Sequence, residues 1–320
     1  MQQPLISIIT PSYNRAWIIQ KCINCIRRQT YPNIEHIVID GGSNDGTVEL
    51  LQQNETGHNF RWISEPDAGM YDAINKGMKL ATGEIVAYLN TDDFYFPYAV
   101  ELAVRKFQED ATIDLVYSDW VTYYEESDFL EILPFLNYTK YDMARFGVLP
   151  QPTVFMRRKI FAQLGYFDTS YKLLADNEFF TRVFMADLHV EKIQEFLAGQ
   201  VVHKGNLLAG NERAVRQALD ESDRFHTMYW VQLAESGDST DYLARVSANL
   251  RNKTYRAIWR LRLLEFYFRF RWGKSKKWHH FIRILPKQSI NELTLLKYLV
   301  SQDRRAIPYC VIPDFLATIC

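Results

Sequence analysis

The chain has 320 residues and a formal net charge of −1 at pH 7, with 48% hydrophobic and 23% charged residues. This composition is that of a globular protein, and the length suits one large domain or a domain of about 200–230 residues with an appendage. A net charge near zero argues against a general nucleic-acid-binding protein. The first residues lack the basic region and cleavage site of a signal peptide, and no apolar run reaches the roughly 18 residues of a spanning helix. We therefore expect a cytoplasmic protein.

The N-terminal part of the chain alternates between short apolar runs and helical patterns. We expect strands at residues 5–10, 34–40, 61–64 and 85–89, and helices at residues 17–29, 48–53 and 70–81. Alternation at this period predicts an α/β fold whose sheet begins with parallel strands and is flanked by helices.

Polar, acidic and glycine residues follow each of these four strands. The strand ends carry Thr10-Pro11-Ser12, Asp40-Gly41-Gly42, Glu65-Pro66-Asp67 and Asn90-Thr91-Asp92-Asp93. Ligands of open α/β sheets bind outside the carboxyl ends of the strands, so these residues are expected to share one edge. This convergence predicts a binding site.

Asp92 and Asp93 are adjacent carboxylates at the end of a buried apolar strand. Two like charges repel each other unless solvent or a cation shares them. A hard divalent cation that bridges to a diphosphate would explain the pair, because such cations take oxygen ligands. A solvated turn, in which aspartate is common, is the alternative.

The second half of the predicted sheet is less regular. We expect a helix at 99–108, a strand at 115–118, a hairpin or insertion at 123–134 and a proline-bounded strand at 149–156. Helices are expected at 157–164 and 174–185, followed by a strand at 190–197, with His203 near its end. From residue 211 the pattern is helical, so we place a catalytic domain at 1–210 and a helical C-terminal extension at 211–320.

The C-terminal extension contains a strongly basic stretch at residues 252–287, in which arginine columns separate two aromatic and apolar stripes. One stripe would pack on the domain, and the other would suit an anionic membrane surface or a partner. A buried helix whose arginines reach solvent is the alternative. Cys22 and Cys25 fall inside a helical pattern and have no second ligand pair, so buried thiols are favoured over redox or metal chemistry.

Taken together, the motifs in their order and spacing resemble a family-2 glycosyltransferase with the GT-A fold over roughly the first 200 residues. The forms Ser64-Glu65-Pro66-Asp67 and Leu89-Asn90-Thr91-Asp92-Asp93 look most like the bacterial branch that builds O-antigen and related surface polysaccharides. The other motifs that carry the resemblance are residues 9–14, 40–47, 75–77, 165–168 and 175–178.

The resemblance implies a role for each residue that matches the family pattern. The nucleotide would be held by Thr10, Pro11, Ser12, Asp40, Glu65, Asp67 and Lys76, with the Asp40 carboxylate reading the N–H of uracil. Contacts to the donor or acceptor sugar would come from Asp93, Asp119, Gln151 and Glu178.

The resemblance also implies a metal site and a catalytic base. Asp92, supported by Asp93, would bind Mn²⁺ or Mg²⁺ on the diphosphate. His203 would be either a late metal ligand or a structural histidine, with the structural role favoured. Asp176 would take the proton from the acceptor hydroxyl.

Two departures from the family pattern bear on these roles. Asn90 stands where the usual Asp-x-Asp has its first acid, which weakens one metal or ribose contact. Ala175 replaces the acidic neighbour of Asp176, which leaves Glu178 as a second candidate for the base.

The implied function is an inverting transfer of a hexosyl or N-acetylhexosaminyl group from a nucleotide-diphosphate donor, with UDP favoured, to a saccharide or polyprenyl-linked acceptor. The protein would lie in the cytoplasm or on the inner face of the cytoplasmic membrane. It would not bind nucleic acid. A non-catalytic nucleotide-sugar-binding protein is one alternative. A sugar nucleotidyltransferase is another, although residues 11–15 lack the glycine-rich, basic loop of that class. A dehydrogenase is disfavoured because residues 40–43 lack GxGxxG order.

Overall fold

The computed structural model describes residues 3–55, 59–125, 129–133, 135, 137–145, 147–203, 206 and 211–236. The chain divides into two compact units: the first contains the described residues through Thr227, and the second contains those from Met228. The basic stretch at 252–287, Cys310 and Cys320 lie outside the described residues. The predicted domain boundary at residue 210 therefore stays a prediction.

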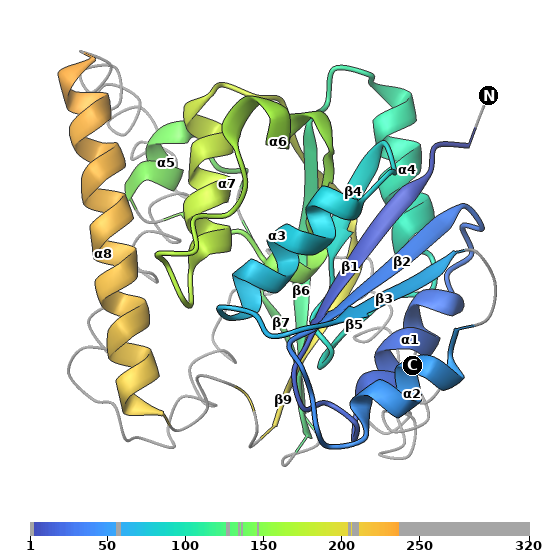
Figure 1. Cartoon of the computed structure of the whole chain (residues 1–320). Helices are drawn as coiled ribbons and strands as arrows, with labels where there is room; N and C mark the ends of the chain where they lie inside the picture. The colour runs from blue at the N-terminus through green and yellow to red at the C-terminus, as the bar shows by residue number, and fades with distance from the viewer. Residues whose placement is uncertain are drawn as a thin grey trace. The chain divides into compact units, whose positions relative to one another are not determined.

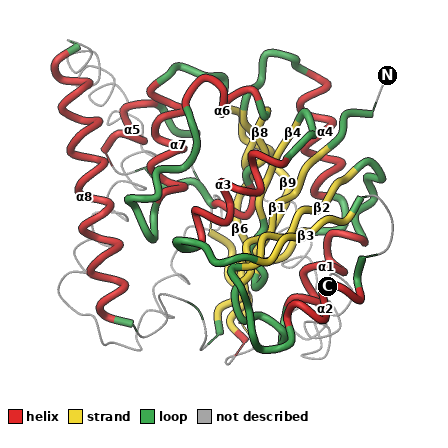
Figure 2. Tube along the Cα trace, viewed as in Figure 1, coloured by secondary structure: helices red, strands yellow, loops and turns green. Residues whose placement is uncertain are grey.

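A mixed sheet forms the centre of the first unit. The strands are β1 (Ile6–Ser12), β2 (Ile34–Asp40), β3 (Phe60–Ser64), β4 (Ile85–Tyr88), β5 (Asp93–Tyr95), β6 (Leu115–Tyr124), β7 (Phe129–Leu133), β8 (Phe155–Arg157) and β9 (Val190–Val202). Their order is β3-β2-β1-β4-β8-β6-β9-β5, with β7 beside β6 (Figures 1 and 2). β1 to β4 are mutually parallel, which confirms the predicted start of the sheet. β8 runs antiparallel to both β4 and β6.

Helices cover both faces of this sheet. They are α1 (Ile19–Arg27), α2 (Thr47–Gln53), α3 (Met70–Leu80), α4 (Ala99–Glu109), α5 (Lys140–Arg145), α6 (Lys159–Leu164), α7 (Ala175–Met185) and α8 (Glu212–Glu235). Alternate residues of β2 face opposite ways. Val38 packs with Ile23 of α1 and Leu51 of α2, whereas Ile39 faces Gly77 of α3. In Figure 1, α3 crosses in front of the sheet. Within the described residues, no helix is both long and apolar enough to cross a bilayer.

Several predicted elements differ from the structure for local reasons. The first strand was expected to end at Thr10, but β1 continues through Pro11. The pairing of β1 with β4 ends at Ile9, so beyond that point β1 has a neighbour only on the β2 side. Proline is tolerated where a strand has a free edge. The predicted strand at 149–156 is wrong in its first half, because Gln151–Thr153 forms a 3-10 turn before β8. Of the two alternatives predicted for residues 123–134, a hairpin or an insertion, the β6–β7 pairing shows the hairpin.

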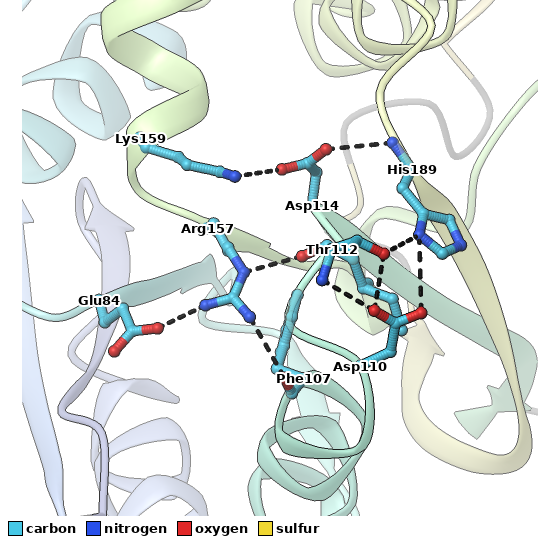
Figure 3. A network of polar contacts seen from close by, with 9 residues as sticks. Glu84, Phe107, Asp110, Thr112, Asp114, Arg157, Lys159 and His189 are labelled. Carbon is cyan, nitrogen blue, oxygen red and sulfur yellow. Dashed lines mark hydrogen bonds and ion pairs between the residues drawn. The ribbon is translucent and has the colours of Figure 1, made fainter.

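A network of hydrogen bonds and ion pairs stabilises the edge of the sheet at which β4, β6 and β9 begin (Figure 3). Arg157 pairs with Glu84 and donates from Nε to the Ile113 carbonyl at 2.8 Å. The Asp114 carboxylate lies 2.8 Å from Lys159 Nζ and accepts from the His189 amide at 3.1 Å. This edge is opposite the carboxyl ends of β1 to β4, so the network holds the sheet without occupying the ligand side.

Candidate functional site

The carboxyl ends of the first three strands lie level with one another. Ser12 pairs in register with Asp40, and Asp40 pairs with Ser64. Their loops therefore leave the sheet at the same edge, as the sequence predicts. The Gly41 amide also donates to the Ser12 carbonyl at 2.8 Å, which joins the first two loops directly.

The Asp40 carboxylate organises these loops. Its Oδ2 accepts from the Ser43 amide at 2.8 Å, from Ser64 Oγ at 2.7 Å and from the Gly42 amide at 3.1 Å. Its Oδ1 accepts from Ser43 Oγ at 2.5 Å. Ser43 Oγ in turn accepts from the Asn14 amide at 2.7 Å. Asp40 is fully buried, and these four donors fill most of the acceptor capacity of a carboxylate.

The loop after β3 packs on the loop after β2. A Cβ added at Gly41 would lie 2.7 Å from Asp67 Oδ2, so a side chain there would displace the Asp67 carboxylate. Asp67 Oδ1 accepts from the Gly69 amide at 2.8 Å, just before α3. Lys76 of α3 reaches back to this loop and pairs with Glu65 at 2.8 Å. Glu65, Asp67 and Lys76 are therefore brought together beside Gly41.

Thr10 and Ser12 differ in what surrounds their hydroxyl groups. Thr10 Oγ1 lies 2.9 Å from His36 Nε2 beneath α1, and burial lowers the pKa of His36 to about 3, so this imidazole is neutral. Ser12 Oγ is buried and has no hydrogen-bond partner among the described residues. An unpartnered buried hydroxyl is costly, so Ser12 Oγ is a suitable contact for a ligand.

A second cluster follows β4. Asn90 Nδ2 donates to Asp93 Oδ2 at 3.1 Å and to Gln151 Oε1 at 3.3 Å. Asn90 Oδ1 is buried without a hydrogen-bond partner among the described residues. Burial and then the neighbouring Asp92 charge raise the pKa of Asp93 well above its usual range. The adjacent acids therefore do carry the repulsion that the sequence predicts.

Asp92 is the more accessible of the two acids, with its side chain 18% exposed. Its Oδ2 lies 3.3 Å from His203 Nε2 and 3.2 Å from Asn206 Nδ2. The His203 ring packs edge-on against the exposed Trp17, with ring centroids 5.2 Å apart. His203, distant in sequence, is thus placed beside Asp92.

Asp176 lies in the first turn of α7 and is buried. Tyr71 Oη donates to its Oδ1 at 2.9 Å, and Tyr88 Oη donates to its Oδ2 at 3.1 Å. The Asn177 amide also donates to Oδ1 at 2.8 Å. Burial raises the pKa of Asp176, while the hydrogen bonds from Tyr71, Asn177 and Tyr88 oppose that shift.

Tyr88 connects this carboxylate to the cluster after β4. Its side chain donates to Asp176, and its backbone carbonyl accepts from Gln151 Nε2 at 2.8 Å. Gln151 Oε1 accepts from Asn90, which also holds Asp93. Hydrogen bonds at the two ends of Tyr88, and then through Gln151 and Asn90, therefore connect the candidate base to Asp93.

Two other predicted residues are paired within the protein. Glu178 forms an ion pair with Arg182 of the next helical turn at 2.9 Å. Among the described residues, the hydrogen-bond donors to Asp176 are all neutral. Asp119 is buried and lies 2.6 Å from Lys192 Nζ, and its Oδ1 also accepts from the Phe135 amide at 2.6 Å. The structure does not bring Asp119 into the hydrogen-bonded chain that joins Asp176 to Asp93.

Tyr71 and Tyr88, whose hydroxyls donate to Asp176, were not predicted from the sequence. Tyr71 precedes Ile74 and Met78 of α3 at helical spacing, and this spacing predicts that the Tyr71 side chain faces the core. Tyr88 lies in a strand with every residue buried, and nothing in such a run marks a hydroxyl that has a buried acid as its partner.

The cluster after β4 fits a hard divalent cation in part. Asp92 and Asp93 offer carboxylate oxygens, and Asn90 offers a buried oxygen without a partner among the described residues. Over those same residues, no three acidic, histidine or cysteine side chains converge closely enough to hold a metal ion by themselves. This set suits Mg²⁺-like binding, in which one or two carboxylates act together with substrate phosphates and water.

Two solved structures are similar to this fold. A mannosyltransferase of Pyrobaculum calidifontis, solved with GDP-Man and Mn²⁺, has a TM-score of 0.50 and 18% identity, and covers 80% of this chain and 83% of its own. Residues 1–349 of S. aureus TarS, solved with UDP-GlcNAc, have a TM-score of 0.50 and 17% identity, with 63% of this chain and 60% of that chain covered. The fold is therefore GT-A-like, a mainly parallel sheet flanked by helices.

Sequence comparison defines the family. The Glycosyl transferase family 2 profile matches residues 7–165. An uncharacterized glycosyltransferase of Mycobacterium tuberculosis is 34% identical over 182 residues, which cover 56% of this chain and 68% of that protein. A PGL/p-HBAD biosynthesis glycosyltransferase of the same species is 31% identical over 190 residues, or 58% of this chain and 71% of that protein. The chain belongs to glycosyltransferase family 2.

Proposed function

We propose that this protein transfers a sugar from a nucleotide-diphosphate donor to an acceptor hydroxyl with inversion at the anomeric carbon. The observation that carries the proposal is the buried Asp176, joined through Tyr88, Gln151 and Asn90 to Asp93. The Asp176 carboxylate and the acidic pair lie at opposite ends of this network. Asp176 would accept the proton of the acceptor hydroxyl on one side of the sugar, and the acidic pair would hold the metal and diphosphate on the other.

The reaction needs one bond to form and one to break at the anomeric carbon. The acceptor oxygen attacks from the face opposite the diphosphate, and the bond to the diphosphate oxygen breaks with its electron pair. The acceptor proton passes to the Asp176 carboxylate, which is a general base of the kind that contributes about 10²–10⁴-fold in rate. A single displacement of this kind inverts the anomeric centre.

The nucleotide would lie against the loops after β1, β2 and β3. Ser12 would contact it through its unpartnered hydroxyl, and Asp67 and Lys76 lie beside the same loops. Asp40 would act mainly by shaping the 41–43 turn, because its carboxylate already accepts four hydrogen bonds. The UDP and UDP-GlcNAc complexes of the similar TarS support a UDP-sugar as the donor.

Asp92 and Asp93 would hold Mn²⁺ or Mg²⁺, with His203 beside them. Such a cation offsets negative charge on the leaving diphosphate and orients it. The Mn²⁺ in the similar mannosyltransferase structure supports this proposal. We expect EDTA to abolish transfer and Mn²⁺ to restore it, measured as UDP release. Full activity in EDTA would rule out the metal role of Asp92.

The acceptor would be a saccharide or a polyprenyl-linked saccharide in surface polysaccharide synthesis, as in O-antigen assembly. The basic stretch at 252–287 would bring the protein to the inner face of the cytoplasmic membrane. A panel of nucleotide sugars in a thermal-shift assay would identify the donor first, because a ligand that binds the folded state raises apparent stability.

The decisive test replaces Asp176 with asparagine. We expect Asp176→Asn to bind UDP normally and to lose about 10²–10⁴-fold in transfer, since only the proton acceptor is removed. Glu178→Gln serves as the matched comparison, and a larger loss there would move the base to Glu178. Release of pyrophosphate from UTP and a sugar 1-phosphate, with formation of a UDP-sugar, would indicate a nucleotidyltransferase. Tight UDP binding without any product would favour a non-catalytic protein.

A further inference from the structure

Glu221 of α8 holds the backbone segment that leads into α7. Its Oε1 accepts from the Lys172 amide at 2.8 Å, and its Oε2 accepts from the Leu173 and Leu174 amides at 2.9 Å and 3.0 Å. Burial acts to raise the pKa of Glu221, but these backbone hydrogen bonds outweigh it and the net pKa is lowered. One ionised side chain therefore satisfies three consecutive amides.

Neighbouring residues of α8 reinforce this contact within the first unit. Gln217 Nε2 donates to Glu221 Oε1 at 2.9 Å, which fixes the carboxylate on its own helix. The Arg224 guanidinium lies over the Tyr171 ring, 3.6 Å from its centroid, and Nη2 donates to Ser170 Oγ at 2.8 Å. The segment from Ser170 to Leu174 is thus held along its length by one face of α8.

The segment that Glu221 holds also contacts a partner of Asp176. Tyr71 Oη lies 3.0 Å from the Leu173 carbonyl and 2.9 Å from Asp176 Oδ1. Leu174 is the residue immediately before α7, and Asp176 is in the first turn of that helix. A hydroxyl has one proton, so the Leu173 carbonyl and Asp176 compete for that of Tyr71. A shift of Leu173 would change this sharing, and a shift of Leu174 would displace the start of α7.

We propose that Glu221 is a positioning residue for the Asp176 carboxylate, acting through the Lys172–Leu174 segment and the Tyr71 hydroxyl. Its effect on turnover rests on the proposed function, in which Asp176 is the base. Its effect on the geometry around Asp176 does not. Glu221 touches neither Asp176 nor the strand ends, so its role is to fix the place from which the carboxylate acts.

Glu221→Gln is the principal variant, studied in the full-length protein. A glutamine keeps the shape but presents an NH₂ group to at least one of the three amides, which loses its acceptor. We expect kcat to fall by about 10²-fold, the effect of a misplacement near 1 Å, with UDP affinity unchanged within about twofold. Asp220→Asn is the matched control, because Asp220 is the exposed neighbour on the same helix, and kcat should stay at the wild-type value.

A second measurement does not depend on turnover. We expect ¹³C NMR titration to show a pKa for Asp176 in Glu221→Gln that differs from the wild type, because the sharing of the Tyr71 proton between Leu173 and Asp176 changes. Tyr71→Phe should raise the same pKa with the Glu221 contacts intact. The double variant should show no more than the larger single effect, since both changes act on one connection.

The outcomes separate the two proposals. If the wild type transfers no sugar from any donor, the proposed function fails, and the NMR titration still tests Glu221. An Asp176 pKa that is unchanged in Glu221→Gln overturns the positioning role, whatever the activity. A loss of kcat with equal loss of UDP binding in Glu221→Gln also overturns it, because that pattern reports general disruption of the domain.

Discussion

Asp176, the proposed base, is a buried carboxylate that still accepts hydrogen bonds suited to its ionised form. Burial favours the protonated carboxyl and so raises the pKa of Asp176, because the charged form is poorly solvated there. The Tyr71 and Tyr88 hydroxyls and the Asn177 amide stabilise the charged form, and the pKa of Asp176 remains raised after these opposing effects. A raised pKa makes the group a stronger proton acceptor than an ordinary aspartate while it is ionised.

The pH dependence of transfer follows from this environment. The base must be ionised to accept a proton, so kcat should fall as the pH is lowered through the pKa of Asp176. Because that pKa is raised, the loss should begin at a pH above the ordinary aspartate value of about 3.9. The measurement is a kcat profile from pH 4 to 9 with saturating donor.

Residual activity of Asp176→Asn provides the control for the pH profile. Without a carboxylate at this position, the same acidic limb should disappear. An identical limb in both proteins would assign the ionisation to another group.

At the residue scale, sequence reasoning found acids more readily than their partners. Asp92 and Asp93 were identified as a pair because they are adjacent in the chain, and the structure brings His203 beside Asp92. The hydroxyl donors to Asp176 come from α3 and β4, about a hundred residues earlier. Contacts at that separation depend on how the elements pack, which local patterns do not encode.

At the scale of elements, α3 depends on close contact with the sheet. A Cβ added at Gly77 would lie 2.5 Å from Ile9 Cγ2 and 3.3 Å from Ile39 Cγ1. This helix also places Tyr71 beside Asp176 and Lys76 beside Glu65, in the two halves of the candidate site. The spacing between α3 and the sheet thus controls the placement of both side chains.

We predict that Gly77→Ala destabilises the protein. An extra methyl group in a filled core costs about 1–3 kcal/mol. Replacing a helical glycine with alanine gains about 1 kcal/mol in helix propensity, and the cost of overpacking exceeds this gain at the upper end of its range. Urea denaturation monitored by circular dichroism measures the difference. Lys79→Ala, at an exposed position of the same helix, is the control and should change stability by no more than about 0.5 kcal/mol. A variant at position 77 as stable as that control would contradict the close packing.

The parallel strands and their helices could be predicted from the sequence, whereas the shorter elements could not. β1 to β4 are apolar runs separated by helices of ordinary length, so periodicity was sufficient. β5 has three residues and exists because Asp93–Tyr95 pairs with Gln200, Gly199 and Ala198 of β9. Gly199 permits that pairing, since a Cβ there would lie 2.4 Å from Phe94 Cζ. The formation of such a short strand depends on pairing with its neighbour more than on its own sequence.

At the scale of the whole molecule, the basic stretch predicts attachment to anionic membranes. Replacing Arg256, Arg260, Arg269 and Arg271 with glutamine should weaken binding to phosphatidylserine vesicles by up to about a thousandfold, at about 1 kcal/mol for each basic residue. Vesicle sedimentation of the full-length protein measures the change.

The control for vesicle binding neutralises an equal number of basic residues elsewhere. Lys21, Arg28, Arg105 and Arg213 are exposed in the described part of the chain. Their replacement by glutamine should leave vesicle binding nearly unchanged. Equal losses in the two variants would show that general charge, and not the 252–287 stretch, attracts the membrane.

Tyr88 belongs to both halves of the candidate site, since its hydroxyl donates to Asp176 and its backbone carbonyl accepts from Gln151. We expect a residue shared in this way to link proton binding and donor binding thermodynamically. If a bound nucleotide sugar changes the proton affinity of Asp176 by some factor, protonation of Asp176 changes the donor affinity by the same factor. Donor affinity measured across pH would therefore report on the proton acceptor before any acceptor sugar is known.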